Sequence, residues 1–292
     1  MTATSSRPRL TDRAGWVHLE HSRIERRDSA LVALREEGEI VLPAAEIQVL
    51  SLGPGTSVSH AAACTLAETG TTLVWVAEGG IRLYAAATGP QATTERLLRQ
   101  ASAWADPKRR MAVARAMYTL RFGEVVDETL DIRALRGREG LRMRAAYAAA
   151  AAETGVAWDG RSTRGHDWRD ETPINRALST ANACLYGLVA SVLATVGYSL
   201  AIGFIHTGRS LSFVYDIADL YKTELTVPVA FAVVAEDTHD FERRTRVACR
   251  TAFSEATLAE CVLRDADALF GSASTVEITG DVDGDGLWDD PR

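Results

Sequence analysis

The hydrophobic pattern of the chain changes once, near residue 90, and this change constrains the fold more than any other feature of the sequence. Before it, short β-rich runs such as 39–42, 47–52 and 72–76 are separated by Gly, Pro and Asp-Ser, which is typical of strands and turns. Beyond it, apolar residues recur at spacings of three and four, which is typical of helices. The sequence therefore predicts an α+β protein: a small N-terminal β-sandwich-like domain with one helix, followed by a larger all-α domain.

The predicted elements follow this division. Strands are expected at 15–21, 30–34, 39–42, 47–52, 72–76 and 81–85, and one helix at 57–68 with Gly70 at its end. Helices are then expected at 93–104, 107–122, 132–154, 173–195, 211–222, 228–235, 239–252 and 254–270. The predicted domains are a β-rich domain at 1–88, a hinge at 89–92, a helical catalytic domain at 93–275 and an acidic, flexible tail at 276–292.

The distribution of charge is more informative than its sum. A net charge of −7 argues at first against a nucleic-acid-binding protein, but five aspartates lie in the last dozen residues, so the body of the chain is closer to neutral. Two groups of arginines stand out, one around Glu139 and one spaced i, i+3, i+7: Arg133, Arg136, Arg138, Arg142 and Arg144, and then Arg243, Arg246 and Arg250. Each group is consistent with a solvated helix face, yet two groups flanking one acidic site favour contact with a phosphate backbone.

Cysteine usage and hydropathy indicate where the protein works. The four cysteines have no paired spacing, which favours buried free thiols in a reducing cytoplasm and disfavours a zinc site. The N-terminus lacks an apolar signal-peptide core. The longest apolar stretch, 181–204, is interrupted by Asn182, Gly187 and Gly197, so we expect a core helix and a turn rather than a membrane span. These features predict a cytoplasmic protein with no membrane partner.

The chemistry is concentrated in residues 201–222. The apolar residues 201–205 precede His206, and a Thr-Gly turn follows it. The next apolar segment carries Asp216 and Asp219. In a helix, residues three apart share a face, so the two carboxylates project in the same direction. A histidine and two carboxylates suit a divalent cation. A buried histidine and a solvated acidic face are the simpler alternative, but aspartates set among apolar residues favour a site, because unpaired charge there is costly.

These residues carry a family resemblance. Residues 202–219, IGFIHTGRSLSFVYDIAD, resemble the catalytic motif of the CRISPR-associated integrase family Cas1 in its type I-E form. Two further blocks agree and occur in the expected order, LRGREGLR at 135–142 and GPGTSVSHA at 53–61. The likeness covers roughly residues 8–270, and long motifs in order are far more specific than a short match. It implies the same two-domain fold as the hydrophobic pattern.

The resemblance also assigns a site. It implies that Glu139, His206 and Asp219 are the metal ligands, and that they hold Mg²⁺ or Mn²⁺ against a phosphodiester. Asp216 joins them as a catalytic residue, either as an auxiliary ligand or as a partner that orients a ligand. Arg209 and Lys222 either clamp a phosphate or offset the carboxylates. The full set of candidate DNA contacts is Arg82, Arg138, Arg142, Arg209, Lys222, Arg243, Arg246, Arg250 and the aromatic Tyr186.

Three functions are compatible with these residues. The first, which the resemblance implies, is a DNA integrase of CRISPR adaptation that joins the 3′-hydroxyls of a short foreign DNA fragment to the CRISPR repeat by transesterification. The second is a metal-dependent DNA endonuclease or branched-DNA resolvase that uses water, and the third is a catalytically silent assembly subunit. An intact ligand set argues against the third.

The family also implies partners. Its members form homodimers, and two homodimers flank a central dimer of the small protein Cas2 in a hetero-hexamer. The N-terminal sandwich is the expected dimerisation surface. The apolar runs 74–76 and 81–84 give this surface weak independent support, since they look too apolar for a fully exposed edge.

Overall fold

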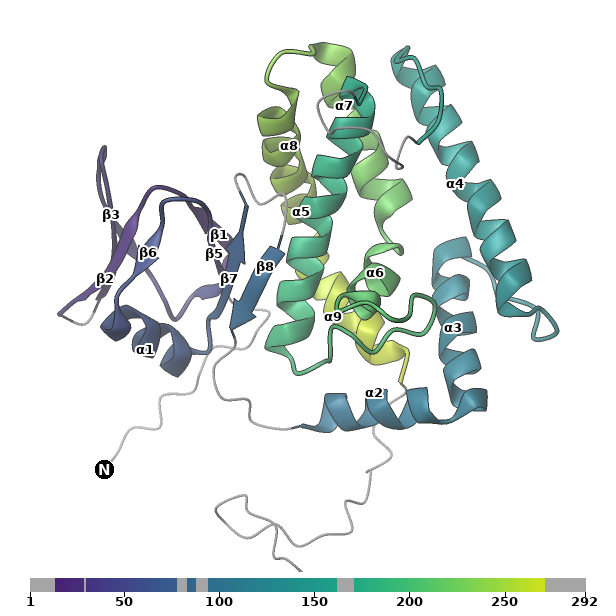
Figure 1. The fold of residues 1–292 in the computed structure, drawn as a ribbon, viewed down its shortest axis with the longest axis horizontal. Coiled ribbons are helices and arrows are strands. Elements are labelled where there is room, and N and C mark those ends of the chain that lie inside the picture. Colours follow the sequence, from purple (N-terminus) through teal and green to yellow (C-terminus); the bar gives the residue numbers. More distant parts are fainter. Residues whose placement is uncertain (1–13, 29, 78–82, 88–93, 162–170, 271–292) are drawn as a thin grey trace, which may run out of the picture.

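The computed structural model describes residues 14–28, 30–77, 83–87, 94–161 and 171–270. It confirms the predicted α+β architecture, with a β-rich N-terminal part beside a helical C-terminal part (Figure 1). The predicted hinge at 89–92 and the tail at 276–292 lie outside the described residues, so both remain predictions.

Two four-stranded sheets and one helix form the N-terminal part. The first sheet has the order β1-β5-β7-β8 and is parallel except for its last pair, whereas the second has the order β4-β3-β2-β6. The strands are β1 (Ala14–Leu19), β2 (Arg23–Arg27), β3 (Ala30–Arg35), β4 (Gly38–Leu42), β5 (Ile47–Leu52), β6 (Ser57–Val58), β7 (Thr72–Val76) and β8 (Leu83–Ala87). The helix is α1 (His60–Thr69), and its Leu66 meets Leu50 and Leu52 of β5 in the core of this part.

Two strands were not predicted. β2 has the sequence RIERR, which contains one apolar residue, Ile24, and this residue alone is buried. A single apolar side chain is too weak a signal to predict a strand. β6 was included in the predicted helix, but Ser57 and Val58 pair with β2, and the helix starts only after Ser59. The Ser59 side chain accepts a hydrogen bond from the Ala62 N–H, and Gly70 ends α1 in the left-handed conformation.

Eight α-helices and one turn of π-helix make up the described helical part. They are α2 (Glu95–Ala105), α3 (Pro107–Phe122), α4 (Ile132–Thr154), α5 (Pro173–Thr195), α6 (Ser212–Ala218), η4 (Lys222–Thr226), α7 (Val227–Glu236), α8 (Phe241–Glu255) and α9 (Leu258–Ala268). Their predicted bounds are confirmed for α3, α4 and α5, because each begins at a side-chain cap: Asp106, Asp131 and Thr172.

The predicted helix at 211–222 is confirmed up to Ala218 and is wrong over its last four residues. The α-helix ends at Ala218, and the chain then enters the wider turn of η4 before α7. Pro228 in the first turn of α7 has no N–H to donate, so a regular helix cannot run through this junction. Single π turns are frequent at functional sites, and this one begins at the candidate residue Lys222.

α5 is the central helix of the C-terminal core. It packs against α6, α7, α8 and α9 and also contacts β7 and β8 (Figure 1). By length and composition alone it could cross a membrane, although the sequence predicts a core helix here. In the folded protein, 78% of its most apolar window is buried, as expected for a core helix.

The apolar run 74–76 has a different role from the one expected. Thr72 of β7 contacts Thr195 of α5 through its hydroxyl, and alternate strand residues share a face, so Val74 and Val76 also point toward α5. Both valines are buried and cluster with Val49. The helical part of the same chain therefore covers them, and they do not support a dimer surface. Trp75 is 38% exposed and Tyr84 is 65% exposed.

Candidate active site

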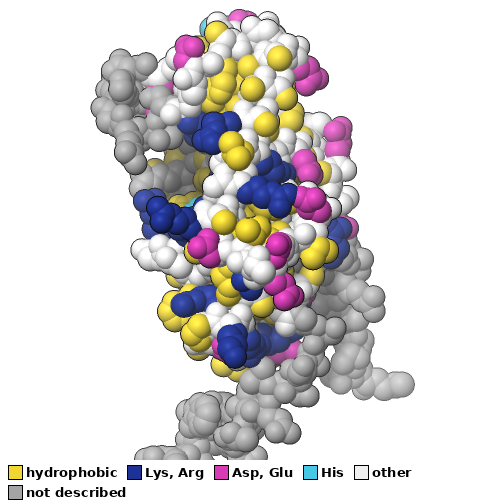
Figure 2. Space-filling view, turned by 90° about the vertical axis from the view of Figure 1, so that its right-hand side faces the viewer, with side chains coloured by type: hydrophobic (Ala, Val, Ile, Leu, Met, Phe, Trp, Pro, Cys, Tyr) yellow, Lys and Arg dark blue, Asp and Glu magenta, His cyan; other side chains and the backbone are white. Residues whose placement is uncertain are grey.

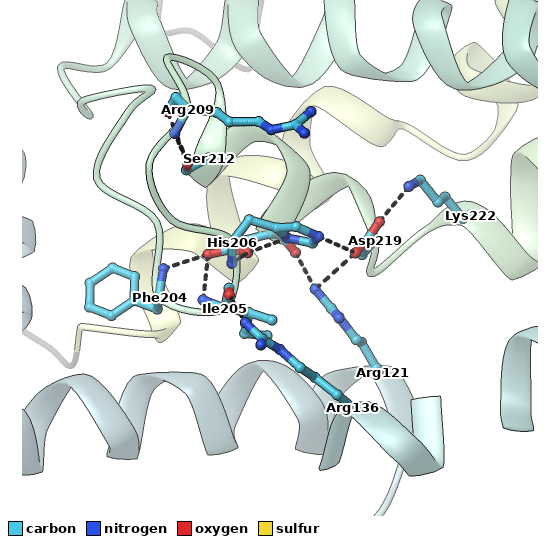
Figure 3. A network of polar contacts seen from close by, with 10 residues as sticks. Arg121, Arg136, Phe204, Ile205, His206, Arg209, Ser212, Asp219 and Lys222 are labelled. Atoms are coloured by element: carbon cyan, nitrogen blue, oxygen red, sulfur yellow. Dashed lines mark hydrogen bonds and ion pairs between the residues drawn. The ribbon is translucent and has the colours of Figure 1, made fainter. Parts of the chain in front are cut away.

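The four candidate catalytic residues come from three segments. Glu139 lies on α4, His206 lies in the irregular segment between α5 and α6, Asp216 lies on α6, and Asp219 directly follows α6. His206 and Asp219 point toward one another in the close view of this region (Figure 3). Residues far apart in the sequence thus meet where α3, α4 and α6 approach each other.

Asp216 is fully buried, and its carboxylate is saturated with hydrogen bonds. One oxygen, Oδ2, accepts from the backbone N–H groups of Phe204 at 2.6 Å and Ile205 at 3.0 Å. The other, Oδ1, accepts from the His206 backbone N–H at 2.8 Å and lies 2.8 Å from His206 Nδ1. These four contacts leave Asp216 turned toward the backbone and the imidazole, which is the geometry of an orienting partner.

The contact with Asp216 orients the imidazole of His206. Because a carboxylate only accepts hydrogen bonds, Nδ1 is the nitrogen that donates to Asp216, and Nε2 is left for other contacts. Nε2 lies 3.9 Å from Oδ2 of Asp219, and the side chain is 44% exposed. The ring of Tyr215 packs edge-on against the imidazole at a centroid distance of 5.9 Å. His206 is thus held by Asp216 through Nδ1, with Nε2 on the side of Asp219.

Two cations hold Asp219. Lys222 Nζ lies 2.6 Å from its Oδ1, and Nη2 of the buried Arg121 lies 3.5 Å from its Oδ2. Burial opposes the ionisation of Asp219, but Lys222 and Arg121 outweigh it, so the pKa of Asp219 is below its ordinary value. Burial also opposes the charged form of Lys222 and by itself would lower its pKa, but the neighbouring Asp219 raises the pKa of Lys222 above its ordinary value. Both groups are therefore charged near neutral pH.

Glu139 differs from Asp219 because its partners are weaker. Burial raises the pKa of Glu139, and the more distant charges of Arg121 and Arg142 only reduce that effect. Arg142 Nη1 lies 3.6 Å from Glu139 Oε1, while the buried Oε2 has no hydrogen-bond partner among the described residues. A buried carboxylate oxygen without a partner is costly, and a cation bound there would offset this cost.

The donor set fits a divalent ion in its chemistry. Glu139 and Asp219 offer carboxylate oxygens and His206 offers an imidazole nitrogen, a mixture that Mg²⁺ and Mn²⁺ accept. The unpartnered Oε2 of Glu139 agrees with this fit. As they stand, no three His, Cys, Asp or Glu side chains within the described ranges are close enough to hold an ion together. Lys222 and Arg121 take the oxygens of Asp219 instead.

Four of the candidate DNA contacts lie at this site. Lys222 sits over the ring of Tyr186 at 4.9 Å, and Arg142 Nη2 donates to Thr223 Oγ1 at 2.7 Å. The guanidinium of the exposed Arg209 extends above His206 (Figure 3) and forms no ion pair with any described residue. Figure 2 shows the face on which α4 lies, where Lys and Arg side chains gather over the middle and lower part with Asp and Glu side chains among them.

The remaining candidates are not at the site. Arg138 is paired with Glu124 and stacks over Phe122 at 4.5 Å. α8, which carries Arg243, Arg246 and Arg250, lies on the other side of α5 and α7 from α4 (Figure 1). The arginines of α8 are therefore separated from the carboxylates by α5 and α7, and their contact with DNA stays a prediction. Arg82 lies outside the described residues.

Sequence reasoning missed the role of Arg121. It lies at the end of α3, donates to the Asp216 backbone oxygen at 2.9 Å and pairs with Asp219. Arg136, noted only as one of the arginines around Glu139, donates to the Ile205 backbone oxygen. Nothing in the spacing of Arg121 connects it to residues 95 positions later in the sequence, so only the packing of α3 against α6 shows its role.

This arrangement defines a class: a two-domain protein whose helical domain carries a carboxylate–imidazole site suited to a divalent ion and flanked by cations. The family model described as CRISPR associated protein Cas1 matches residues 16–124 and 121–260. The chain belongs to the Cas1 family.

Known proteins resemble the chain over most of its length. The CRISPR-associated endonuclease Cas1 2 of Thermus thermophilus is 44% identical over 287 residues, which cover 97% of this chain and 88% of the relative. The solved TtCas1–DNA complex is 44% identical, with a TM-score of 0.73, and the match covers 88% of this chain and 97% of that one. A casposase bound to its integration product has a TM-score of 0.65 at 14% identity, covering 90% of this chain and 92% of the casposase, and shares the fold alone.

Proposed function

We propose that this protein is a metal-dependent DNA integrase of CRISPR adaptation, of type I-E. In this role it joins the 3′-hydroxyl ends of a short foreign DNA fragment to the CRISPR repeat by transesterification, with Mg²⁺ or Mn²⁺ as cofactor. The observation that carries the proposal is the pair of His206 and Asp219 together with the unpartnered Oε2 of Glu139, with Asp216 orienting the imidazole. The relative named as an endonuclease and the solved DNA complex of a relative support DNA as the substrate.

The residues divide the work as follows. Glu139, His206 and Asp219 would hold the ion, which when bound neutralises charge on the phosphoryl oxygens and lowers the pKa of the attacking hydroxyl. Asp216 keeps the proton on His206 Nδ1, so that Nε2 remains a ligand. Lys222 and Arg209 supply positive charge next to the ligands and would position a phosphate. Arg121 stays buried behind Asp219 and holds its carboxylate in place.

The alternative function is hydrolysis by the same site. A general DNA endonuclease or branched-DNA resolvase would use water where the integrase uses a DNA 3′-hydroxyl, and the name of the Thermus relative favours a nuclease. Both reactions need the same ligands, so the nucleophile distinguishes them.

We further propose that the protein acts in the cytoplasm as a homodimer and that two homodimers flank a central Cas2 dimer. The N-terminal sandwich is the proposed homodimer surface. Its exposed apolar side chains include Val41 on β4 at 67% and Tyr84 on β8 at 65%. These positions, rather than Val74 and Val76, are the ones to alter in a test of dimerisation by light scattering.

A strand-transfer assay tests the proposed function. A labelled duplex with 3′-OH ends is incubated with a supercoiled plasmid carrying a type I-E repeat, with and without Cas2, in Mg²⁺, Mn²⁺ or EDTA. The proposal predicts metal-dependent transfer of the label to the repeat and no transfer from a duplex with 3′-dideoxy ends. Plasmid nicking that is unaffected by the dideoxy ends, without transfer of the label, would favour the endonuclease instead.

A further inference from the structure

The segment that carries His206 has no regular secondary structure. It runs from Val196, just after α5, to Leu211, just before α6. Its backbone N–H and C=O groups therefore lack the partners that a helix or sheet would supply, although Phe204 and Ile205 are buried. Side chains from other elements satisfy six of the contacts along residues 199–206, and those side chains restrict where the segment lies.

Asp216 satisfies only one end of the segment. Its carboxylate takes the N–H groups of residues 204, 205 and 206. The other end is held by Gln100 of α2, whose side chain is fully buried. Gln100 Oε1 accepts from the Ser199 N–H at 2.8 Å, and Nε2 donates to the backbone oxygens of Ser199 and Ile202, both at 3.0 Å. All the hydrogen bonds of this buried amide go to one stretch of backbone.

Between these two anchors the chain has little freedom. A Cβ on Gly203 would lie 2.2 Å from the His206 backbone oxygen and 2.7 Å from Ser212 Cβ, so the segment is packed tightly against the start of α6. The Phe213 N–H donates to the Leu200 oxygen at 2.9 Å. A displacement at Ser199 or Ile202 therefore cannot be absorbed before it reaches His206.

α2 is itself held in place beside Gln100. Arg96 lies one turn earlier on the same face and forms a bidentate ion pair with Asp267 of α9, at 2.8 and 2.9 Å. The Tyr198 hydroxyl donates to the same carboxylate at 2.7 Å. Arg96 and Gln100 thus connect α9, α2 and residues 198–202 into one unit, and Gln100 is the member that contacts the backbone of the segment.

From this geometry we infer that Gln100 is a positioning residue for His206. Gln100 fixes residues 199–202, and Asp216 fixes residues 204–206. The imidazole of His206 reaches Asp219 only when both of these stretches are held in place. This inference rests on the proposed function, because it assigns Gln100 to the placement of a proposed metal ligand. Gln100 does not touch the reacting atoms, so its effect appears in the rate of the reaction rather than in the affinity for DNA.

Two substitutions test this role. Gln100→Met keeps the volume and removes every hydrogen bond, whereas Gln100→Glu keeps the shape and the acceptor for Ser199 but brings an oxygen against two carbonyl oxygens. The single-turnover rate constant for strand transfer at saturating DNA should fall about ten- to hundredfold in both variants, with at least as large a fall for Glu, because small misplacements of a catalytic group have effects of this size. The DNA concentration for half-saturation should not change. If the Met variant fails to fold, the Glu variant carries the test.

A control and a second readout separate positioning from simple destabilisation. Val262→Ala removes buried volume from α9 without a change in polar contacts, and its thermal stability is compared with that of the Gln100 variants. The imidazole ¹⁵N signals of His206, assigned with His206→Ala, should shift or broaden in the Gln100 variants, while those of His18 and His60 remain in place. A rate and a His206 spectrum no different from those of Val262→Ala would overturn the inference. If the wild-type protein transfers no strand, the proposed function fails, and the spectra still decide whether Gln100 positions His206.

Discussion

The cations around Asp219 and the arginines of α8 are chemically alike but differ in their surroundings. Arg121 and Lys222 have side-chain exposures of 1% and 18% and share one carboxylate. Arg243 is 68% exposed, and its partner Asp240 lies on the same surface. Neither Arg246 nor Arg250 forms an ion pair with any described residue. A positive charge at low exposure fixes the geometry of the site, whereas one in solvent is available to a partner and is screened by salt.

This difference predicts a ranking of effects. Changes at the buried residues Asp216 and Arg121 should reduce stability and activity together, because each leaves a buried group without its partner. Changes on α8 should leave stability almost unaltered and should alter only DNA binding, in a salt-dependent manner.

The largest effect is expected for Asp216→Ala. This variant leaves three backbone N–H groups and one imidazole without an acceptor. Because each orphaned buried donor costs about 1–3 kcal/mol, we expect the free energy of unfolding to fall by roughly 4 kcal/mol or more. Urea denaturation measures the loss. Asp237→Ala, which alters an exposed carboxylate, is the matched control, and equal stability of the two variants would contradict the assigned role of Asp216.

A smaller loss is expected for Arg121→Met. The substitution keeps an apolar stem but removes the guanidinium that pairs with Asp219 and donates to the Asp216 backbone oxygen. Since Lys222 still compensates Asp219, the free energy of unfolding should fall by about 3 kcal/mol, near the lower limit for breaking a buried ion pair. Strand transfer should fall as well. Arg243→Met on the exposed surface is the control, and a loss of similar size in that variant would remove the distinction between the two regions.

The α8 arginines should matter for DNA and hardly for folding. In the combined variant Arg243→Ala, Arg246→Ala and Arg250→Ala, we expect stability to change by no more than about 0.5 kcal/mol. Duplex binding should weaken to a similar extent for unrelated sequences, and the salt dependence should fall by up to about three phosphate contacts. Fluorescence anisotropy over a salt series measures both. A loss confined to one DNA sequence, or no loss, would indicate a salt-bridged surface helix instead.

The smallest effect is expected from the acidic C-terminus. Five aspartates occupy residues 281–292, and like charges of this density compete weakly with DNA for basic surfaces. Deleting the residues after Gly280 should therefore tighten nonspecific DNA binding at low salt and leave it unchanged at high salt. Unchanged binding across the whole salt series would mean that this segment does not compete with DNA.

Local signals in the sequence predict much of the fold. Asp106, Asp131 and Thr172 cap α3, α4 and α5, and the predicted bounds of these helices are confirmed. β2 escaped prediction because its neighbours in the sheet, not its own residues, make RIERR a strand. The end of α6 escaped it because the apolar pattern continues past Ala218, where the structure has turns and then η4 instead of an α-helix.

The residues of the candidate site also fall into two groups, those that the sequence predicts and those that only the structure shows. His206, Asp216 and Asp219 lie within one short motif, so their spacing and their apolar surroundings identify them. Arg121 and Gln100 contact this motif from other helices, and nothing in their spacing along the sequence predicts these contacts. A single sequence therefore predicts the residues of the motif, while the side chains that hold the motif in place are found only through the packing of α2 and α3.

The central claim is that His206 is a ligand in a metal-dependent strand-transfer site, and His206→Ala tests it most directly. The imidazole is 44% exposed, so its removal should leave the fold intact, as checked by circular dichroism and thermal unfolding. Strand transfer of the labelled 3′-OH duplex in Mn²⁺ should then fall to the level measured in EDTA. A folded His206→Ala protein that transfers strands at a rate near that of the wild type in Mn²⁺ would contradict the account.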